Sequence, residues 1–563
     1  MHSPAINGEP EVKEVDVLLI GAGFGGCYSL YKLRQLGLNV HVFEAGAYLG
    51  GVWHWNTYPG ARVDSEIPYY QFSVAEVWRK WNWSERFPSG EELRAYFKHV
   101  DETLNLSKDI TYSANVIDAR YDELTMKWTV TTENGHKAVC KYFICATGSS
   151  FKPHYPDFKN LDKFQGQIIH STRWPEVANT NNQRVAVIGS GATAVQCTQE
   201  IAKVAKHLTV YIRTASISLP MFQRSLSEFE QRVNKSTYRG IFEKCRKSKS
   251  GLGYDQQPGS VYDLNDNERE ELWEELWNRG GFNFNQANYR DFLVDQKANK
   301  LMYEFWAKKT RPRLKNPIKS AFLVPEKAPF AFGTKRSSLE QDYYECLDQD
   351  NVDIVDLKAN AIQKFTERGI ICQDGVEREF DTIVMATGFD AMTGSLTNMN
   401  IHGRDGLTFR ERWKDGVFTH LGLCSSGCPN LFMIYGPQGK FSSGILLKIL
   451  LTFYTAPTAF SNGPVFIESQ VDILVDLIKK LEKEGIRSIE GQRSAEEQWK
   501  QAIQDANDKT LLPLTDSWYM GANIPGKKRE QLNYLGGIAN YELECRKALK
   551  NLEGFTVFYD TDK

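Results

Sequence analysis

Two short glycine-rich segments in this sequence have the spacing of loops that bind phosphate groups. The first is Gly21-Ala-Gly23-Phe-Gly-Gly26, and the second is Gly189-Ser-Gly191-Ala192-Thr193-Ala194. Glycines at these positions allow the backbone to approach a pyrophosphate, which then lies at the N-terminus of the following helix. The chemistry that both segments predict is therefore the binding of a dinucleotide.

Each glycine loop is expected to lie between a first strand and a helix that leads to a second strand. The residue that ends this second strand indicates which dinucleotide binds. Glu44 occupies this position after the first loop, where a carboxylate accepts hydrogen bonds from a ribose and repels a 2'-phosphate. The first site is therefore predicted to bind FAD or NAD. Arg213 and Thr214 occupy the position after the second loop. Because Arg presents paired donors to phosphate oxygens, the second site is predicted to bind NADPH.

The elements that must position these residues follow from the apolar pattern. Continuous apolar runs at Val15–Ile20 and Arg184–Ile188 predict buried parallel strands that lead directly into the two loops. Ala-Thr-Gly turns follow the strands expected at 141–145 and 382–385, which resembles the domain crossings of flavoproteins that bind two dinucleotides. The first domain is therefore predicted to be discontinuous. Strands are also predicted at 39–43, 128–132, 209–212, 339–346 and 352–355, and a helix at 28–36.

Composition narrows the class of protein. A chain of 563 residues is too long for one core and predicts two or three domains. The formal net charge of -2 gives no reason to expect a nucleic acid or an anionic membrane as partner. The apolar segment 445–454 is too short to span a bilayer, and no signal peptide is indicated.

The cysteines exclude two further classes of protein. All ten are scattered, without a Cys-x-x-Cys pair. Cys424 and Cys428 have neither a second pair nor a histidine cluster beside them, so no metal site is predicted. The lack of a closely spaced pair near the first loop argues against the disulfide reductases that bind two dinucleotides. We expect a reduced, cytoplasmic protein.

The segment between the two loops, FQGQIIHSTRWP at 164–175, has residue types that predict a connector rather than a strand or a helix. Gly166 permits a backbone angle that other residues resist, and Pro175 prevents a helix from continuing. The expected anchors of this connector are the three ring-bearing residues Phe164, His170 and Trp174.

The spacing Phe-x-Gly-x-x-x-His-x-x-x-Trp-Pro in this connector resembles the fingerprint of the Baeyer-Villiger monooxygenases. Flavin monooxygenases that oxygenate nitrogen or sulfur have a similar motif that ends in Tyr or Phe. The segment from Gly50 to Asp64 is similar to a second family motif, Gly-Gly-x-Trp with Tyr-Pro-Gly, which wraps the flavin. The resemblance extends from Val15 to Gly536 and implies a class B flavoprotein monooxygenase similar to the cyclohexanone and phenylacetone monooxygenases.

The fold implied by this resemblance is an α/β fold with two Rossmann-like dinucleotide-binding domains and a helical insertion. The expected divisions are a disordered tail at 1–14, an FAD-binding domain at 15–150 and 386–563, an NADP-binding domain at 151–221 and 329–385, and the insertion at 222–328. Helical runs at 267–277 and 298–308 support the insertion. Residues 515–530 are expected to form a mobile loop over the nicotinamide.

The resemblance also implies site residues. Arg336 is implied as the catalytic residue, with Asp64 as the carboxylate that pairs with it. The residues implied to bind FAD are Gly21, Gly23, Gly26, Glu44, Gly51, Val52, Trp53, Asp64, Tyr70 and Val116. The residues implied to bind NADP are Arg62, Gly189, Gly191, Ala192, Thr193, Arg213, Thr214, Lys335 and Trp518. His170 is expected to serve conformational coupling rather than proton transfer.

The reaction implied is the conversion of a ketone into an ester or lactone by NADPH and O2 through a C4a-peroxyflavin. A guanidinium suits this reaction because it stays charged and stabilises an anionic peroxide. Two other interpretations stay open: a flavin monooxygenase that acts on nitrogen or sulfur, and an uncoupled NADPH oxidase or dinucleotide-binding protein. The chain is expected to be a monomer or a weak homo-oligomer.

Residues 439–455 depart from the family pattern. Family members usually run from Gly-Pro-Gln almost directly into Ala-Pro-Thr-Ala-Phe-Ser-Asn-Gly-Pro, whereas here this segment separates Gln438 from Ala456. Two hypotheses account for it: a lineage-specific loop, or translation of a retained intron. Because the corresponding family loop borders the substrate pocket, the shape of that pocket and the activity depend on which hypothesis holds.

Overall fold

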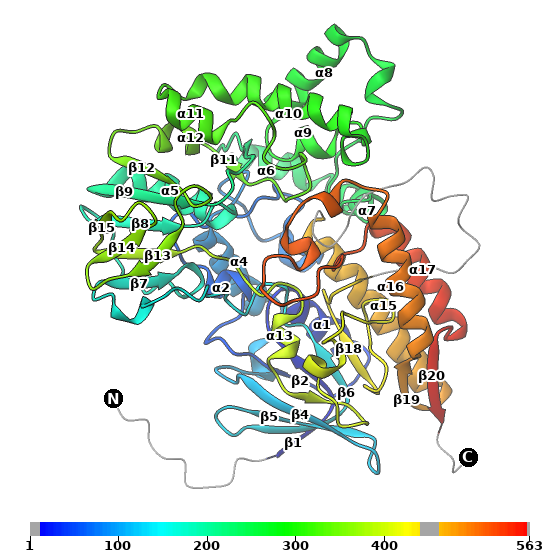
Figure 1. Cartoon of the computed structure of the whole chain (residues 1–563). Helices are drawn as coiled ribbons and strands as arrows, with labels where there is room; N and C mark the ends of the chain where they lie inside the picture. Colours follow the sequence, from blue (N-terminus) through cyan, green and yellow to red (C-terminus); the bar gives the residue numbers. More distant parts are fainter. Residues whose placement is uncertain (1–11, 440–460, 560–563) are drawn as a thin grey trace.

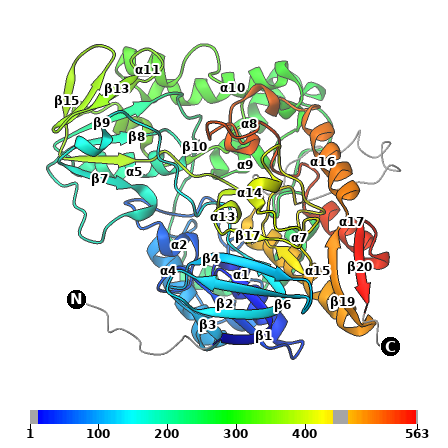
Figure 2. The same ribbon diagram turned by 60° about the horizontal axis from the view of Figure 1, so that its bottom comes forward.

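The structure is a computed structural model that describes residues 12–439 and 461–559. Figure 1 shows two sheets in separate regions of the molecule, one at the bottom and one at the upper left, with the helices of the middle of the chain across the top. Figure 2 shows that the C-terminal helices and strands lie beside the first sheet. The described helices contain none that is both long enough and apolar enough to cross a membrane.

The first sheet is built around β1 (Val12–Ile20), whose residues Val17, Leu18 and Leu19 are completely buried. The strand order is β17-β4-β5-β6-β1-β2-β3, and β18 also pairs with β6. β1 is parallel to β2 and β6, whereas β5 is antiparallel to both of its neighbours. The other strands are β2 (Val40–Phe43), β3 (Ile110–Thr111), β4 (Val116–Asp122), β5 (Lys127–Thr132), β6 (Lys137–Cys145), β17 (Ile401–His402) and β18 (Leu431–Met433).

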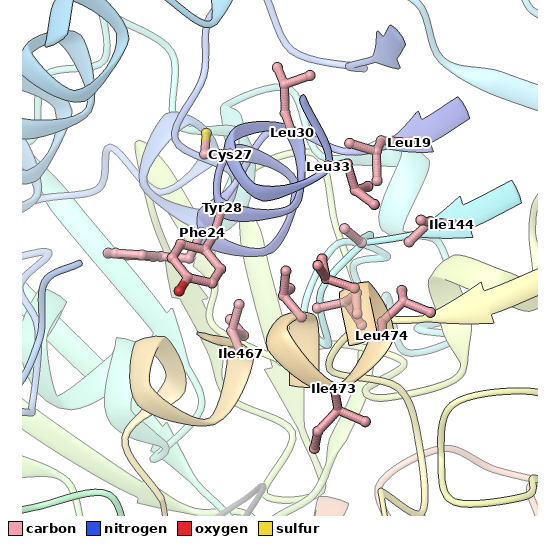
Figure 3. Packing of buried hydrophobic residues seen from close by; sticks show 14 of the residues in the cluster. Leu19, Phe24, Cys27, Tyr28, Leu30, Leu33, Ile144, Ile467, Ile473 and Leu474 are labelled. Atoms are coloured by element: carbon pink, nitrogen blue, oxygen red, sulfur yellow. The ribbon is translucent and has the colours of Figure 1, made fainter. Parts of the chain in front are cut away.

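Two helices from opposite ends of the chain cover this sheet, α1 (Phe24–Arg34) and α15 (Gly463–Glu484). Figure 3 shows apolar side chains of α1 and α15 packed with Leu19 of β1 and Ile144 of β6. The first unit is therefore built from two separate stretches of chain, as the discontinuous pattern predicts. Its other elements are α2 (Val52–Trp55), α3 (Ala75–Trp78), α4 (Gly90–Leu104), α13 (Gly394–Thr397), α14 (Phe409–Arg412), α16 (Arg493–Asn507), α17 (Ile538–Asn551), β19 (Ile486–Gly491) and β20 (Phe555–Tyr559).

The expectation of a disordered tail at 1–14 is wrong for its last three residues. Residues 12–14 begin β1 and pair with residues 137–139 of β6. Their side chains are exposed, and those of Lys13 and Glu14 are charged, but the neighbouring strand satisfies their backbone hydrogen bonds, and this fixes them as strand. Residues 1–11 lie outside the described residues, as do residues 440–455 of the segment that departs from the family pattern.

The second sheet is entirely parallel, with the order β12-β9-β8-β16-β7. Its strands are β7 (Gln167–His170), β8 (Arg184–Ile188), β9 (His207–Ile212), β12 (Val352–Asp356) and β16 (Thr382–Met385). Helix α5 (Ala192–Val204) begins directly after the second glycine loop. An antiparallel sheet of β13 (Ile362–Phe365), β14 (Gly369–Cys372) and β15 (Glu377–Glu379) completes this unit.

The strand predicted at 339–346 is mostly wrong. Only Leu339–Glu340 form a short strand, β11, and α12 (Tyr343–Leu347) follows. Four of the five residues of α12 are buried, at positions that one face of a helix brings together. The apolar run therefore reflects burial of a helix rather than alternation along a strand.

The fingerprint segment contains a strand, which contradicts the prediction of a connector without one. β7 pairs in parallel with β16 at the edge of the second sheet, from Gln167 opposite Thr382 onward. Gly166 does not adopt a left-handed angle either. A Cβ on Gly166 would lie 2.5 Å from the Phe164 ring and 2.7 Å from the Asp381 carbonyl oxygen. Glycine is therefore required there for close packing rather than for an unusual backbone angle.

Residues 228–323 form six α-helices. They are α6 (Glu228–Lys235), α7 (Tyr238–Lys247), α8 (Asp266–Arg279), α9 (Asn283–Gln286), α10 (Gln296–Thr310) and α11 (Pro317–Leu323). Of these, α8, α9, α10 and α11 lie across the top of Figure 1, while α6 and α7 lie below them. The short strand β10 (Leu219–Pro220) precedes them and pairs in parallel with β11, which follows them. This pairing joins the two ends of the insertion at its base.

We expect Gly166→Ala to destabilise the protein, because the added Cβ requires the Phe164 ring or the Asp381 carbonyl to move. Overpacking of this kind costs about 1–3 kcal/mol. Gly240→Ala in α7 is the matched control, since a Cβ there meets nothing within 4 Å. Thermal unfolding of both variants measures the effect. Equal unfolding midpoints for Gly166→Ala and the wild type would contradict the packing account.

Candidate active site

A cavity of about 340 Å³ connects the first glycine loop with Arg336, since both line it. The predicted residues that line this cavity are Gly21, Gly23, Glu44, Gly51, Val52, Asp64, Tyr70, Val116, Arg336 and Trp518. Of the residues implied to bind FAD, Gly26 and Trp53 are not among its lining residues. The structure thus brings most of the residues implied for FAD together with the implied catalytic pair.

The first glycine loop is shaped for close backbone approach. Gly21 has a φ of +99°, and a Cβ on it would lie 2.7 Å from the Ala146 carbonyl oxygen. Gly51 has a φ of +55°, and its Cβ would lie 2.9 Å from the Cα of Gly23. A Cβ on Gly26 would lie 1.7 Å from the Gly21 carbonyl oxygen, so Gly26 allows α1 to pack against the loop. The two turns meet backbone to backbone, as an approaching pyrophosphate requires.

Glu44 closes β2 and is 4% exposed. Its carboxylate accepts hydrogen bonds from the backbone N–H groups of Ala22 (2.5 Å) and Gly46 (2.6 Å). Burial raises the pKa of Glu44, and these two hydrogen bonds oppose the rise. Glu44 therefore fixes the first glycine loop and also presents an acceptor at the cavity wall.

Trp53 acts from behind the cavity wall. Its indole N–H donates to the Tyr70 hydroxyl at 3.0 Å, and Tyr70 lines the cavity. The Tyr70 ring also makes an edge contact with Phe24 of α1, with a centroid distance of 5.2 Å. Burial raises the pKa of the Tyr70 hydroxyl, which keeps it neutral. Trp53 and Phe24 hold the orientation of Tyr70.

Asp64 and Arg336 form a two-point ion pair inside the cavity. Arg336 Nε donates to Asp64 Oδ2 at 2.6 Å, and Nη2 donates to Oδ1 at 2.8 Å. The side chains are 23% and 29% exposed, for Arg336 and Asp64 respectively. Burial lowers the pKa of Arg336, but the charge and hydrogen bonds of Asp64 outweigh this and raise it above its ordinary value. The guanidinium therefore remains charged at every physiological pH.

Three aromatic residues around Arg336 were not identified from the sequence. The guanidinium lies over the Phe282 ring, 4.8 Å from its centroid. Tyr435, just after β18, lines the cavity, and Tyr519 is completely buried. Burial, opposed by the charge of Arg336, raises the pKa of Tyr435 to about 12. Of these three residues, only Tyr519 had a signal in the sequence, because it directly follows Trp518. Tertiary contacts bring Phe282 and Tyr435 to the site.

The second glycine loop has the same construction as the first. Gly189 has a φ of +142°, and a Cβ on it would lie 2.4 Å from the Ala386 carbonyl oxygen. The Ser190 hydroxyl donates to the Thr214 carbonyl oxygen at 2.7 Å, which joins the loop to the end of β9. A Cβ on Gly191 would meet nothing within 4 Å, so space is open beside the start of α5. Ala192 and Thr193 form the first turn of that helix.

Lys335 and Arg213 place two positive charges near this loop. Burial, followed by the charge of Arg213, lowers the pKa of Lys335 to about 8. The ammonium lies over the Phe330 ring, 4.8 Å from its centroid. A phosphate between these two cations would relieve their repulsion, so their arrangement fits a 2'-phosphate.

Gln196 of α5 joins the two units and was also not identified from the sequence. Its Oε1 accepts from the Tyr58 hydroxyl at 2.8 Å, and its Nε2 donates to the Arg62 carbonyl oxygen at 2.9 Å. A Cβ on Gly60 would lie 2.7 Å from the Gln196 carbonyl oxygen. The guanidinium of Arg62 forms an ion pair with Glu85 at 2.7 Å. Arg62 thus contacts the second unit through its backbone.

Two fingerprint residues, His170 and Trp174, lie where the two units meet. The His170 ring makes contacts with Tyr155 and Phe389, at centroid distances of 4.8 and 6.4 Å. These partners belong to the two chain crossings between the sheets. Arg173 lies over the Trp55 ring at 4.2 Å, and the Trp174 carbonyl oxygen accepts from the Thr57 hydroxyl at 3.3 Å. His170 is 2% exposed, and burial lowers its pKa to about 4.

Characterised proteins resemble this chain along nearly its whole length. Cyclopentanone 1,2-monooxygenase from a Comamonas species is 43% identical over 97% of this chain and 96% of its own length. A Baeyer-Villiger monooxygenase from Pseudooceanicola batsensis is 35% identical over 96% of each chain. This chain belongs to the Baeyer-Villiger monooxygenases. The family predicted from the fingerprint is confirmed.

Other comparisons agree with this family. The crystal structure of cyclohexanone monooxygenase from Rhodococcus sp. Phi1 bound to NADP+ is 33% identical, with a TM-score of 0.91 over 98% of this chain and 100% of that one. The predicted fold class is thereby confirmed. The family described as pyridine nucleotide-disulphide oxidoreductase matches residues 15–252. Phenazine N-monooxygenase from Lysobacter antibioticus is 36% identical over 97% of each chain.

The low pKa of His170 predicts a pH dependence of stability. The unfolded chain binds a proton to this histidine below its ordinary pKa of about 6.5, whereas the folded protein resists protonation down to about pH 4. The folded protein therefore loses stability as the pH falls from about 6.5 to about 4, by up to about 3 kcal/mol.

His170→Gln cannot take up this proton. We therefore expect the stability difference between the wild type and His170→Gln to shrink as the pH falls from about 6.5 to about 4. Chemical unfolding of both proteins at pH 7.5, 6.5, 5.5 and 4.5 measures this difference. A difference that is independent of pH would show that His170 does not titrate in this way.

Proposed function

We propose that this monooxygenase inserts one atom of O2 beside the carbonyl group of a ketone and releases an ester or lactone. NADPH supplies two electrons, and the second oxygen atom leaves as water. The observation that carries the proposal is the Asp64–Arg336 pair, because a permanent positive charge lines the same cavity as the first glycine loop. The reaction needs such a charge where negative charge develops on oxygen.

The cofactors are FAD and NADPH. The first loop fits FAD because its glycines meet backbone to backbone and Glu44, at the end of β2, would repel a 2'-phosphate. When bound, FAD supplies the chemistry that passes electrons from NADPH to O2 and delivers oxygen to the ketone. Residues that would hold it are Gly21, Gly23, Glu44, Gly51, Val52, Asp64, Tyr70 and Val116, with Gly26 and Trp53 supporting them.

NADPH would bind at the second loop. Gly189 and Gly191 leave room for its pyrophosphate at the start of α5, with Ala192 and Thr193 in the first turn. Arg213, Thr214 and Lys335 would hold the 2'-phosphate. Arg62 would act at the junction of the two units, and Trp518 would help to close the cavity over the nicotinamide.

Arg336 would stabilise the negative charge that develops on the carbonyl oxygen when the carbonyl carbon accepts oxygen. Asp64 would hold the guanidinium in one orientation through its two hydrogen bonds. Trp518 and the buried Tyr519 would exclude water from this end of the cavity. His170 would couple the two units rather than transfer protons, since its contacts lie at the chain crossings.

The domain roles follow from these sites. Residues 15–150 and 386–563 would form the FAD-binding domain, and residues 151–221 and 329–385 the NADP-binding domain. Helices at 222–328 would shape the substrate entrance, since Phe282 contributes to the surroundings of Arg336. The free, buried cysteines suit a reducing compartment such as the cytoplasm. We propose a monomer or a weak homo-oligomer.

Oxygenation of a ring nitrogen is the second candidate, and the relative named phenazine N-monooxygenase favours it. Such an activity would transfer oxygen to a nucleophilic atom and would require no anion-stabilising guanidinium. An N-oxide formed from a phenazine, with no ester from any ketone, would select this candidate.

Arg336→Ala is expected to abolish ester formation, because no charge would remain to stabilise the developing oxyanion. A loss of about 100-fold or more is typical for removal of such a group. NADPH oxidation should continue in part, because the two nucleotide loops are untouched. Ester, hydrogen peroxide and NADPH are quantified together for the variant and the wild type. Normal ester yield from Arg336→Ala would refute the role proposed for Arg336.

Arg213→Ala is expected to weaken the binding of NADPH but not that of NADH. Loss of a hydrogen bond to a charged group costs about 1.5–3 kcal/mol, so the KM for NADPH should rise about 10- to 100-fold. The KM for NADH should change little, because NADH lacks the 2'-phosphate. Steady-state kinetics with both coenzymes test this. An equal rise for both would show that Arg213 does not bind the 2'-phosphate.

A further inference from the structure

A second Arg–Glu pair lies next to the Asp64–Arg336 pair in the chain. Glu66 is two residues after Asp64, and its Oε2 accepts from Arg86 Nε at 2.5 Å. Both side chains are largely covered, at 14% exposed for Arg86 and 13% for Glu66. The backbone of the same stretch is fixed as well, since the Ile67 N–H donates to the Arg86 carbonyl oxygen at 2.9 Å. The loop that carries Asp64 is therefore held at both its side chains and its backbone.

The helical insertion contributes a third member of this network, Tyr254. Its hydroxyl donates to the other carboxylate oxygen of Glu66 at 2.7 Å. Burial, and then the charge of Glu66, raises the pKa of Tyr254, so the hydroxyl keeps the proton that it donates. The Tyr254 ring makes an edge contact with Tyr69, at a centroid distance of 5.7 Å. Glu66 thus joins the Asp64 loop to the insertion.

Arg86 extends the network to the turn that carries Phe282. Its Nη1 donates to the carbonyl oxygen of Arg279, the last residue of α8, at 2.9 Å. Gly280 and Gly281 follow with φ values of +67° and +60°, and the chain then reaches Phe282. A Cβ on Gly281 would lie 3.0 Å from the Phe87 ring, so this turn packs closely beside Arg86.

The two ends of the network meet at Arg336. Asp64 holds the guanidinium by two hydrogen bonds, and the Phe282 ring lies beneath it at 4.8 Å. These two contacts come from different units of the fold, since Asp64 follows α2 and Phe282 belongs to the insertion. The network of Glu66, Arg86 and Tyr254 is a direct side-chain link between them.

We propose that Glu66, Arg86 and Tyr254 are positioning residues. They keep Asp64 and Phe282 at fixed positions relative to each other, on either side of Arg336. None of the three is among the cavity-lining residues, so they act through the Asp64 loop and the Phe282 turn. The inference rests on the proposed function for its catalytic consequence. The mechanical link itself is independent of which substrate the enzyme oxidises.

Glu66→Gln and Tyr254→Phe test the network, because the first removes the central charge and the second removes one hydrogen bond. Glu490→Gln is the matched control. Glu490 also pairs with an arginine, Arg404, at 3.2 Å and is 10% exposed, and like Glu66 it does not line the cavity, but neither Glu490 nor Arg404 belongs to the Glu66 network. All variants are compared as FAD-loaded full-length protein, and their FAD content is measured first.

The first measurement is amide hydrogen exchange of the turn at residues 279–283, which needs no ketone. Loss of a hydrogen bond to a charged group should speed exchange there by about tenfold in Glu66→Gln and by less in Tyr254→Phe. Glu490→Gln should match the wild type. Unchanged exchange in Glu66→Gln, or an equal increase in Glu490→Gln, would overturn the inference.

The second measurement is the ratio of ester to hydrogen peroxide at saturating ketone. Glu66→Gln should shift this ratio toward peroxide while FAD content and the KM for NADPH stay at wild-type values. Its effect should be non-additive with that of Phe282→Leu, because both act on the same contact. Additive effects would show that Glu66 does not act through Phe282. If the wild type formed no ester from any ketone, the proposed function would fail, while hydrogen exchange would still decide the positioning role.

Discussion

The ion pair between Asp64 and Arg336 is the interaction on which the site depends. A guanidinium that is mostly covered loses hydration, and a carboxylate at two-point hydrogen-bonding distance restores that stabilisation. The two residues are far apart in the chain, so the pair forms only when the segments that carry them are folded together. The Phe282 ring lies beneath Arg336, and the largely buried pair of Glu66 and Arg86 holds the loop that carries Asp64. Both contacts support the two-point geometry of the ion pair.

The two nucleotide loops depend on a different constraint, the close approach of backbones. Gly21 and Gly189 each lie against the carbonyl oxygen of the alanine that begins an Ala-Thr-Gly crossing, Ala146 and Ala386 respectively. The chain passes between the two units just after these alanines, and His170 packs against both crossings. Any relative movement of the units must therefore act on the residues that shape the phosphate sites.

Sequence patterns predicted the parts of this fold that are encoded locally. The strands at 184–188 and 382–385 have the predicted bounds, because continuous apolar runs mark buried parallel strands. β7 was missed because the strand with which it pairs, β16, lies far along the chain. Phe282, Tyr435 and Gln196 were missed for the same reason, since their roles arise from tertiary contacts. Asp64 and Arg336 were found only through family motifs, as neither has a local signal of its own.

In the reaction proposed for this protein, one atom of O2 enters a ketone beside its carbonyl group. The most direct test supplies FAD-loaded protein with NADPH, a cyclic ketone such as cyclopentanone or cyclohexanone, and ¹⁸O₂, and analyses the products by mass spectrometry. The account predicts a lactone that carries one ¹⁸O atom and forms in step with NADPH loss. NADPH loss with all of the label in hydrogen peroxide, or an unlabelled lactone, would contradict it.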